Sequence, residues 1–482
     1  MSFTPLPRSA PEAQGIASRA LLDLLVALEA RAPGLHSLML LRGSAVVAEG
    51  WWAPYAPTEP HMLFSLSKSF TATAAGLAFA EGLLSPDDPV TSFFPDEVPA
   101  VVGPNLAAMR VRHLLSMSTG HDEDTLTHLV RAQEGDWVRT FLARPVAREP
   151  GTFFLYNSGA TYLVSAILQR LTGQTVRDWL EPRLFAPLGI ATPYWERCPH
   201  GINTGGWGLN LRTEDIARFG LLYARDGEWR GRRLLPAGWV AEATRAHVSN
   251  GDDPDSDWAQ GYGYQFWRCR HNLYRGDGAF GQFCVVLPDH DTLVAITAGL
   301  GDMQGVLNVL WEHLLPALGD APLPADAEGE QALRTRLASL VLPAPAGAPE
   351  SPLAARVSGR TYDLAPNDQQ LTHVTFDFAA RRLSLTGAAG EQQLAWGSNG
   401  TWPRGELAWE SATPERVAAS GAWTADDTFA LGLCWYRTPF CPRLTCRFAG
   451  DEVALDYRLN VSFGPLERPT IVGRLTDGAT GG

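Results

Sequence analysis

Three common signatures of metal proteins and hydrolytic enzymes are missing from this chain of 482 residues. It has no H-E-x-x-H and no C-x-x-C sequence, so we expect neither a metal site nor a cofactor. It also lacks G-x-S-x-G, which excludes the usual α/β-hydrolase arrangement. The histidines nearest the motifs described below, His113, His121 and His200, are interpreted as structural residues.

Cysteine and long apolar runs are also scarce. The six cysteines are too few and too scattered to form a disulfide scaffold in a chain of this length. The N-terminus has no basic start followed by an apolar core, and no run of eighteen apolar residues occurs. We therefore expect a cytoplasmic protein with no membrane partner.

Positive charge is in the minority. The formal net charge is −13, the isoelectric point is about 5.3, and no run of lysine or arginine is present. This balance argues against nucleic acid as a partner. An apolar fraction of 45% is typical of a globular protein, and the length indicates two domains. The oligomeric state is left open.

The most informative segment is Ser65-Leu66-Ser67-Lys68, which opens a long apolar segment predicted to be a helix over 65–84. A serine and a lysine three residues apart lie on one face of a helix. A buried ammonium group has a lowered pKa, so Lys68 is a candidate base that activates Ser65 as a nucleophile. The alternative is that Ser65 caps a helix and Lys68 is a solvated side chain.

A second segment, Tyr156-Asn157-Ser158, follows a Pro-Gly turn and precedes an amphipathic helix. A tyrosine at this place can point its phenol into a cleft. Beside a lysine cation its pKa would fall, and the phenolate would then serve as a general base. The alternative is a core tyrosine whose hydroxyl is bonded to the backbone.

A third segment is rich in glycine and runs from Arg275 to Gln282. Glycines inside a strand usually mark the close approach of another backbone or of a ligand. The edge of such a strand can offer a backbone N–H group to a substrate oxyanion. The alternative is an ordinary glycine-rich hairpin.

The order and spacing of these three segments resemble the serine hydrolases of the β-lactamase and penicillin-binding-protein superfamily, for which S-x-x-K is a signature. The segments 111–120, 205–211, 213–220 and 262–267 are also similar to that family, and the resemblance covers roughly residues 10–318. It is strongest for the class C-like branch, which includes esterases and amide hydrolases of the nylon-oligomer type.

The resemblance implies a mechanism and a set of site residues. Ser65 would attack the substrate and form an acyl-enzyme, while Lys68 and Tyr156 would share the acid and base duties. The backbone N–H groups of Ser65 and Ala279 would form the oxyanion hole. The remaining candidates, assigned to substrate binding, are Asn157, Ser158, Asp277 and Gly278.

Two departures from the family pattern bear on the substrate. Ser158 stands where the family usually has asparagine, and Gly276-Asp277-Gly278 replaces a motif that usually begins with lysine or histidine. Gly276 offers no cation for a substrate carboxylate, and Asp277 would repel one. We therefore expect a small neutral or cationic ester or amide as the substrate rather than a β-lactam.

The chain is predicted to be α+β with a division near residue 320. Residues 1–320 would form the β-lactamase-like domain, with an antiparallel sheet flanked by helices plus an all-helical part. Residues 321–351 read as a helix followed by a linker rich in proline and alanine, and residues 352–482 alternate as short strands of an antiparallel sheet or barrel.

Two hypotheses from different classes remain. The first is a serine hydrolase, and the second is a catalytically silent module of the same fold that serves binding or assembly. The C-terminal domain likewise has two interpretations. It is either a passive stabilising domain, or one of its loops forms a wall of the active-site cleft.

Overall fold

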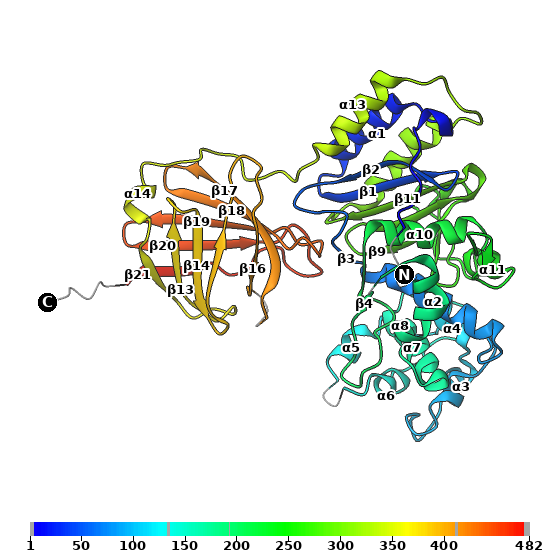
Figure 1. Ribbon diagram of the computed structural model, residues 1–482. Coiled ribbons are helices and arrows are strands. Elements are labelled where there is room, and N and C mark those ends of the chain that lie inside the picture. Colours follow the sequence, from blue (N-terminus) through cyan, green and yellow to red (C-terminus); the bar gives the residue numbers. More distant parts are fainter. Residues whose placement is uncertain (1–3, 133–134, 192, 410–412, 477–482) are drawn as a thin grey trace.

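The computed structural model describes residues 4–132, 135–191, 193–409 and 413–476. Figure 1 shows two bodies side by side: an N-terminal body of helices and strands, and a C-terminal β domain. The chain passes from one to the other after α13 (Ala327–Ala338), and the short helix α14 (Ala354–Val357) and the strand β12 (Thr361–Leu364) already belong to the β domain.

A six-stranded antiparallel sheet forms the centre of the N-terminal body. Its middle strands β1 (Leu35–Arg42) and β11 (Thr292–Ala298) are mostly apolar and are buried along almost their whole length, as expected for strands that are covered on both faces. The first and last strands of the body are neighbours, with Met39 opposite Ala295. The strand order is β2 (Ala45–Trp51), β1, β11, β10 (Gln282–Leu287), β9 (Tyr274–Gly278) and β8 (Trp267–Arg268).

Helices cover both faces of this sheet. On one face, α1 (Ser18–Arg31) packs with α12 (Met303–Val309) and α13 around a leucine-rich core. On the other face, α10 (Thr213–Ala224) packs on β10 and β11 and belongs to a second core shared with α2 (Ser67–Ala80). The sheet therefore lies between two helical layers. Helix α2 belongs to the layer that contains α10.

Helix α2 is the centre of an all-helical part. Twelve of its residues are buried, and a Cβ atom added at Gly76 would lie 2.4 Å from the ring of Trp239. Small residues therefore let neighbouring elements approach the helix closely. The other helices are α3 (Pro104–Ala108), α4 (Val111–Leu115), α5 (Leu126–Val130), α6 (Trp137–Leu142), α7 (Ser158–Thr172), α8 (Val176–Leu180), α9 (Ala186–Leu188) and α11 (Trp239–Thr244).

Two small sheets complete the N-terminal body. The first joins β3 (His61–Met62), β5 (Leu209–Leu211) and β4 (Tyr194–Trp195), and so ties the segment before α2 to the segment before α10. The second is the hairpin of β6 (Glu228–Trp229) and β7 (Arg232–Arg233).

The C-terminal β domain is a single antiparallel sheet of ten strands that curls around an aromatic core. Its two end strands lie next to each other, and the Gln392 side chain exchanges two hydrogen bonds with the Ala408 backbone across them. In order, the strands are β15 (Gly390–Ala395), β14 (Arg382–Gly387), β13 (Leu371–Asp377), β12, β21 (Ile471–Leu475), β20 (Glu452–Arg458), β19 (Arg443–Ala449), β18 (Thr428–Cys434), β17 (Glu415–Ala425) and β16 (Arg404–Leu407).

Polar contacts fix the β domain to the segment that leads into α2. The Met62 N–H donates to the Arg437 carbonyl at 2.8 Å. Glu59, whose side chain is 11% exposed, pairs with Arg437 at 2.7 Å, Arg404 at 3.4 Å and Arg416 at 3.9 Å. A carboxylate held by three guanidinium groups in a mostly buried place is favourable because each charge has an opposite partner.

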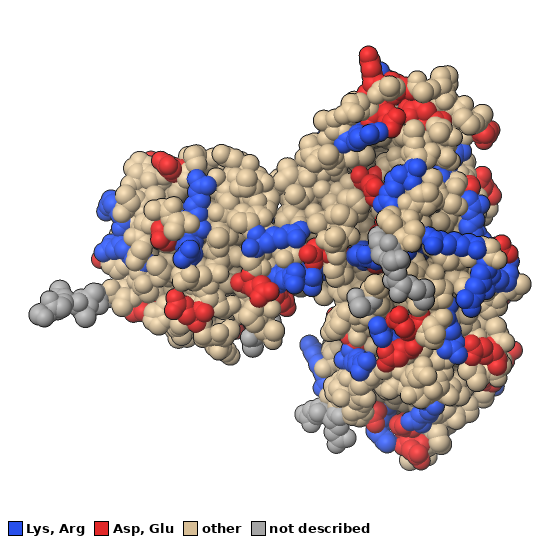
Figure 2. Space-filling model, in the orientation of Figure 1, with Lys and Arg blue, Asp and Glu red and all other residues tan. Residues whose placement is uncertain are grey.

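The predicted fold class is confirmed: the N-terminal body is α+β with an all-helical part, and the C-terminal domain is an antiparallel β domain. One local prediction differs, because α2 begins at Ser67 and Ser65 lies in the preceding short 3-10 helix (Phe64–Leu66). Figure 2 shows acidic and basic side chains mixed over both bodies on this face. Among the described residues, no helix has the length and apolar character that crossing a bilayer requires.

Candidate active site

The nucleophile candidate and the base candidate lie within hydrogen-bond distance. Lys68 Nζ is 3.0 Å from Ser65 Oγ. The lysine is in the first turn of α2 and is 1% exposed, whereas Ser65 in the preceding turn is half-buried. The structure thus gives the hydroxyl an approach for substrate while it keeps the amine away from water.

The rest of the Lys68 environment is polar but carries little charge. Its amine also donates to Ser158 Oγ at 3.2 Å and to the Gly206 carbonyl at 2.8 Å. Burial lowers the pKa of Lys68 to about 7, against a smaller opposing effect of the charges of Asp124 and Asp277. At neutral pH a large share of the amine is therefore unprotonated and able to accept a proton.

The composition of the chain carries a further signal for this residue, which motif spacing alone does not use. Lys68 is the only lysine, and the other 38 basic residues are arginines. Arginine supplies positive charge and hydrogen-bond donors but does not lose its proton in proteins. A single lysine in such a chain indicates a position where a group that can become neutral is needed.

Tyr156 stands on the other side of Ser65. Lys68 Nζ lies 4.7 Å from the centre of its ring, and the Ser65 side chain is one of the neighbours that act on the pKa of its phenol. Burial raises the pKa of Tyr156 above its ordinary value, and the charge of Asp277 adds to the effect. The sequence-based expectation of a lowered tyrosine pKa is therefore wrong, because burial outweighs the lowering effects of Ser65 and Arg275.

Asn157 and Ser158 have different surroundings although they are adjacent. Asn157 Oδ1 accepts hydrogen bonds from Thr125 Oγ1 at 2.8 Å and from the Gly159 N–H at 3.1 Å, so it caps the start of α7. Ser158 faces Lys68, and its N–H donates to Asp124 Oδ1 at 2.9 Å. Asp124, which no sequence motif indicated, thus places a carboxylate beside the site.

The glycine-rich strand β9 presents alternate residues to its two sides. Arg275 and Asp277 share one side, with Arg275 Nε 2.9 Å from Asp277 Oδ2, and both are buried. Gly276 faces the other side, where an added Cβ would lie 2.6 Å from Leu66 Cδ1 and Ser69 Oγ. A side chain at position 276 therefore has no room beside α2, and the charge of Asp277 is compensated by Arg275.

The end of β9 lies against the turn that holds Ser65. A Cβ atom added at Gly278 would be 2.0 Å from the Leu63 carbonyl oxygen and 3.1 Å from the Leu66 nitrogen. Only glycine permits this approach, which brings the backbone at Ala279 beside the turn of Ser65. This is the neighbourhood in which the resemblance places two oxyanion-binding N–H groups.

Two phenylalanines next to these backbone groups have strained conformations. Phe64, directly before Ser65, has φ 47°, and Phe280, directly after Ala279, has φ 68°. Bulky residues seldom adopt the left-handed region, and they persist in it where the surrounding structure holds them. The two rings pack edge to face, with their centres 5.4 Å apart. Phe64 lies directly before the Ser65 motif and Phe280 lies inside the glycine-rich segment, but no local signal in the sequence indicates their left-handed conformation.

Aromatic side chains form one wall of the site. The Tyr156 ring stacks on Trp267 at 5.4 Å, and the Arg275 guanidinium lies 4.3 Å from the Trp258 ring. In the described ranges, no three histidine, cysteine, aspartate or glutamate side chains gather as a metal ion would require. The chemistry that the arrangement offers is proton transfer and nucleophilic attack by a hydroxyl group.

An antiparallel sheet between helical layers, with Ser65 and Lys68 at the start of a buried helix, defines the β-lactamase and penicillin-binding-protein superfamily. The beta-lactamase family model matches residues 19–305, and the chain belongs to that family.

Individual relatives are more distant. The chain is 29% identical over 222 residues to the 6-aminohexanoate-dimer hydrolase of Paenarthrobacter ureafaciens, covering 42% of this chain and 55% of that protein. It is 26% identical over 170 residues to the lovastatin esterase of Penicillium rubens, covering 31% of this chain and 42% of the esterase. The chain therefore spans about half the length of these curated relatives.

The likeness to solved structures can extend over both bodies. The octameric penicillin-binding protein homologue from Pyrococcus abyssi superimposes with a TM-score of 0.51 at 16% identity, covering 95% of this chain and 99% of that one. At this identity the likeness shows the fold alone. It indicates that a β-lactamase-like body followed by a β domain is an arrangement that other proteins share.

Proposed function

We propose that the chain is a serine hydrolase that cleaves a small neutral or cationic ester or amide through an acyl-enzyme on Ser65. The observation that carries this proposal is the 3.0 Å contact between Ser65 Oγ and a buried lysine whose pKa is lowered to about 7. A hydroxyl becomes nucleophilic when a base beside it accepts its proton. Neutral Lys68 is such a base.

Acylation then follows from the positions of the groups. As the Ser65 oxygen bonds to the substrate carbonyl carbon, its proton passes to Lys68 Nζ, and the carbonyl π electrons move to the oxygen. When this oxyanion re-forms the carbonyl, the bond to the leaving alcohol or amine breaks. The leaving group receives a proton from Lys68, directly or through the Tyr156 hydroxyl, because both groups contact Ser65.

The oxyanion is assigned to the backbone N–H groups of Ser65 and Ala279. The close approach of Gly278 to Leu63 supports this assignment, because it brings the two backbones together. A single oxyanion-hole donor typically accounts for about 10²–10³ in rate. Water attacks the acyl-enzyme in the second half of the reaction, and Lys68 accepts the proton of the water.

The charges around the site support a neutral or cationic substrate. Arg275 is fully buried and bonded to Asp277, so this guanidinium is engaged rather than directed at a substrate carboxylate. The names of two relatives, one a hydrolase of an aminohexanoate dimer and the other an esterase, support amides and esters as the substrate class. Ser158 and Gly278 remain the candidates for contacts with the reacting end of the substrate.

The competing hypothesis is a silent module that binds or assembles without catalysis. A fluorophosphonate probe followed by intact-mass measurement separates the two hypotheses. The hydrolase should gain one phosphonyl adduct, and the adduct should be absent when Ser65 is replaced by alanine. An unmodified wild-type protein would favour the silent module.

We expect short neutral esters to be hydrolysed much faster than cephalosporins. A charge-assisted hydrogen bond to a substrate carboxylate contributes roughly 1.5–3 kcal/mol, or about 10- to 150-fold in binding. In this site the Arg275 guanidinium is bonded to Asp277 and is not available for a substrate carboxylate. The measurement compares kcat/KM for p-nitrophenyl acetate and nitrocefin under one set of conditions. Nitrocefin turnover equal to or faster than that of the ester would contradict the assignment.

The Tyr156→Phe variant should slow acylation by about 10²-fold, because general acid–base groups contribute about 10²–10⁴-fold. The double variant Tyr156→Phe with Lys68→Met should lose little more than Lys68→Met alone, since residues that act as one unit are not additive. Tyr262→Phe is the matched control, because its ring stands beside Tyr156 at 6.2 Å. Strictly additive losses would show that the two groups do not share a proton path.

A further inference from the structure

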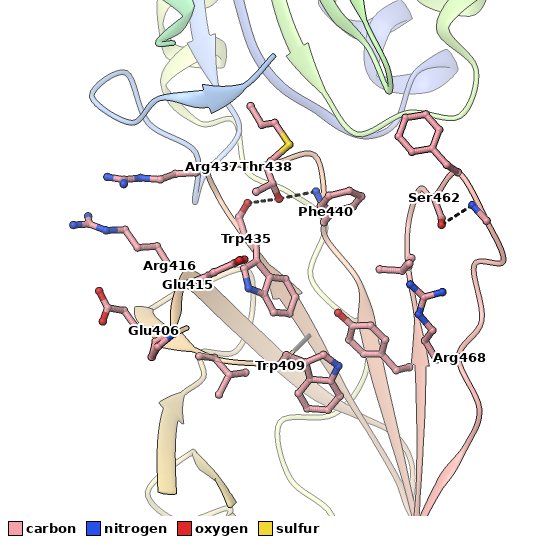
Figure 3. A pocket seen from close by; sticks show the side chains of 17 residues that line it. Glu406, Trp409, Glu415, Arg416, Trp435, Arg437, Thr438, Phe440, Ser462 and Arg468 are labelled. Carbon is pink, nitrogen blue, oxygen red and sulfur yellow. Dashed lines mark hydrogen bonds between the residues drawn. The ribbon is translucent and has the colours of Figure 1, made fainter. Parts of the chain in front are cut away.

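A cavity of about 680 Å³ opens where the C-terminal β domain meets the N-terminal body. Figure 3 shows it above the strands of the β domain, with the ribbon of the N-terminal body across its top. Five of the residues that line it are aromatic, and among these Trp409 stacks on Tyr457 with ring centres 5.0 Å apart. Other apolar contributors are Met62, Trp435, Phe440 and Phe463.

Five charged residues line the cavity: the acidic Glu406 and Glu415, and three arginines that are held by other protein groups. Figure 3 shows Arg416 and Arg437 pointing away from Trp435 and Trp409, and both pair with Glu59. Arg468 Nη1 donates to the Pro465 carbonyl at 3.3 Å. The lining surface is more apolar than polar, and its apolar part lies on the side of Trp409 and Trp435.

This cavity lies next to the backbone segments that hold Ser65 and Ala279. Met62, which lines it, is three residues before the nucleophile. The Phe463 ring lies 4.7 Å from that of Phe280 and 5.9 Å from that of Phe64. The centre of the Phe440 ring lies 6.0 Å from that of Phe280 and 6.4 Å from that of Phe64. Two cavity residues thus pack on the neighbours of Ser65 and of Ala279.

Phe463 is unusual among these side chains, because it is 79% exposed. A large aromatic side chain held open at a cavity rim is a common feature of ligand sites, where covering it adds binding energy. Its position between the cavity and the strained residues Phe64 and Phe280 makes it a bridge from the reacting atoms to the aromatic wall.

We propose that this cavity binds the apolar acyl group of the substrate, which runs from Ser65 over Phe463 toward Trp409. The substrate class is then an ester or amide of a medium-chain or aromatic carboxylic acid. The inference rests on the proposed function, since it places the far end of a substrate whose carbonyl carbon is attacked by Ser65. The C-terminal domain is, on this assignment, a part of the substrate site.

The test uses p-nitrophenyl esters of acetate, butyrate, hexanoate and octanoate, which differ only in the acyl group. Burying one methylene group is worth about fourfold in binding, so kcat/KM should rise at least tenfold from acetate to octanoate. Phe463→Ala should lower kcat/KM for octanoate about tenfold, mainly through KM, and should change acetate less than twofold.

A second variant adds a large side chain to the cavity instead of removing one. Ser462 lines the cavity, and Ser462→Trp should fill it, so that octanoate is lost while acetate is retained. Val472→Ala is the control, because it shortens another exposed apolar side chain of the same domain. Melting temperatures of all three variants report whether the fold is kept.

The possible outcomes distinguish a failure of the cavity assignment from a failure of the proposed serine hydrolase activity. Acetate hydrolysis with a flat chain-length profile in the wild type would overturn the cavity assignment and leave the serine hydrolase intact. Equal losses for acetate and octanoate in Phe463→Ala would also overturn it, because that pattern is a general effect on the active site. Failure to hydrolyse any ester, with no phosphonyl adduct, would instead remove the proposed function itself.

Discussion

Replacing Ser65 with alanine should reduce ester hydrolysis by at least about 10³-fold, because the loss of a nucleophile typically costs several orders of magnitude. The fold should persist, since only a half-buried hydroxyl is removed. Hydrolysis of p-nitrophenyl acetate and the thermal unfolding midpoint are the two measurements. The expected pair of results is a lost rate and a nearly unchanged midpoint.

Ser67→Ala is the matched control for this experiment. Ser67 is fully buried, donates to the Phe64 carbonyl at 2.6 Å and accepts from the Leu209 N–H at 3.1 Å. Its loss should lower stability by about 1–3 kcal/mol, the cost of leaving buried groups unpaired. A Ser65→Ala protein that keeps a few per cent of the rate, beside an inactive Ser67→Ala protein, would show that the nucleophile is the wrong serine.

Replacing Lys68 should also cause a large loss of ester hydrolysis, whether methionine or arginine is introduced. Lys68→Met removes the base, and Lys68→Arg keeps a cation that does not release its proton. Both variants should lose about 10²–10⁴-fold in kcat/KM. In the wild type, the acylation rate should rise with pH and level off above about 7, because the neutral amine is the active form. Substantial activity in Lys68→Arg would refute a role as a proton acceptor.

The pKa of Lys68 can be measured directly from a single NMR signal. Because the chain has a single lysine, protein labelled with ¹³C at lysine Cε should give one lysine resonance, whose shift should follow a titration near pH 7. In unfolded chain the ordinary lysine pKa is about 10.4. Between these two values the unfolded state binds more protons, so folding stability should rise with pH across that window. Lys68→Met should abolish that part of the slope, and an unaltered slope would exclude the lowered pKa.

The pairing of Ser65 with Lys68 could be predicted because it depends on local geometry. Two residues three apart at the start of a helix face the same way whatever surrounds them. The sign of the Tyr156 pKa shift could not be predicted in this way. It depends on how deeply the phenol is buried relative to the pull of one neighbouring charge, and burial is a property of the assembled fold.

The glycine-rich strand shows the same limit. Its position beside the nucleophile followed from the resemblance, but the side on which each residue lies is set by packing. Gly276 faces Leu66 and Ser69, and Arg275 consequently shares a side with Asp277. The aromatic contacts of Phe440 and Phe463 with Phe64 lie still further from prediction, because they join segments almost 400 residues apart in the sequence.

The pairing of β1 with β11 has a consequence for the order of events during synthesis. Leu35–Arg42 meets its partner strand only after residue 298 has left the ribosome, and Lys68 contacts residues that are 90 and 138 positions further along the chain. Such non-local pairing makes folding slow and leaves apolar strands exposed while the chain grows. The β domain is formed from one continuous later segment, so its strands can pair as soon as they emerge. A ribosome-bound chain halted near residue 280 should therefore be inert toward a phosphonate probe, and the reactive serine should appear only after the central sheet has closed.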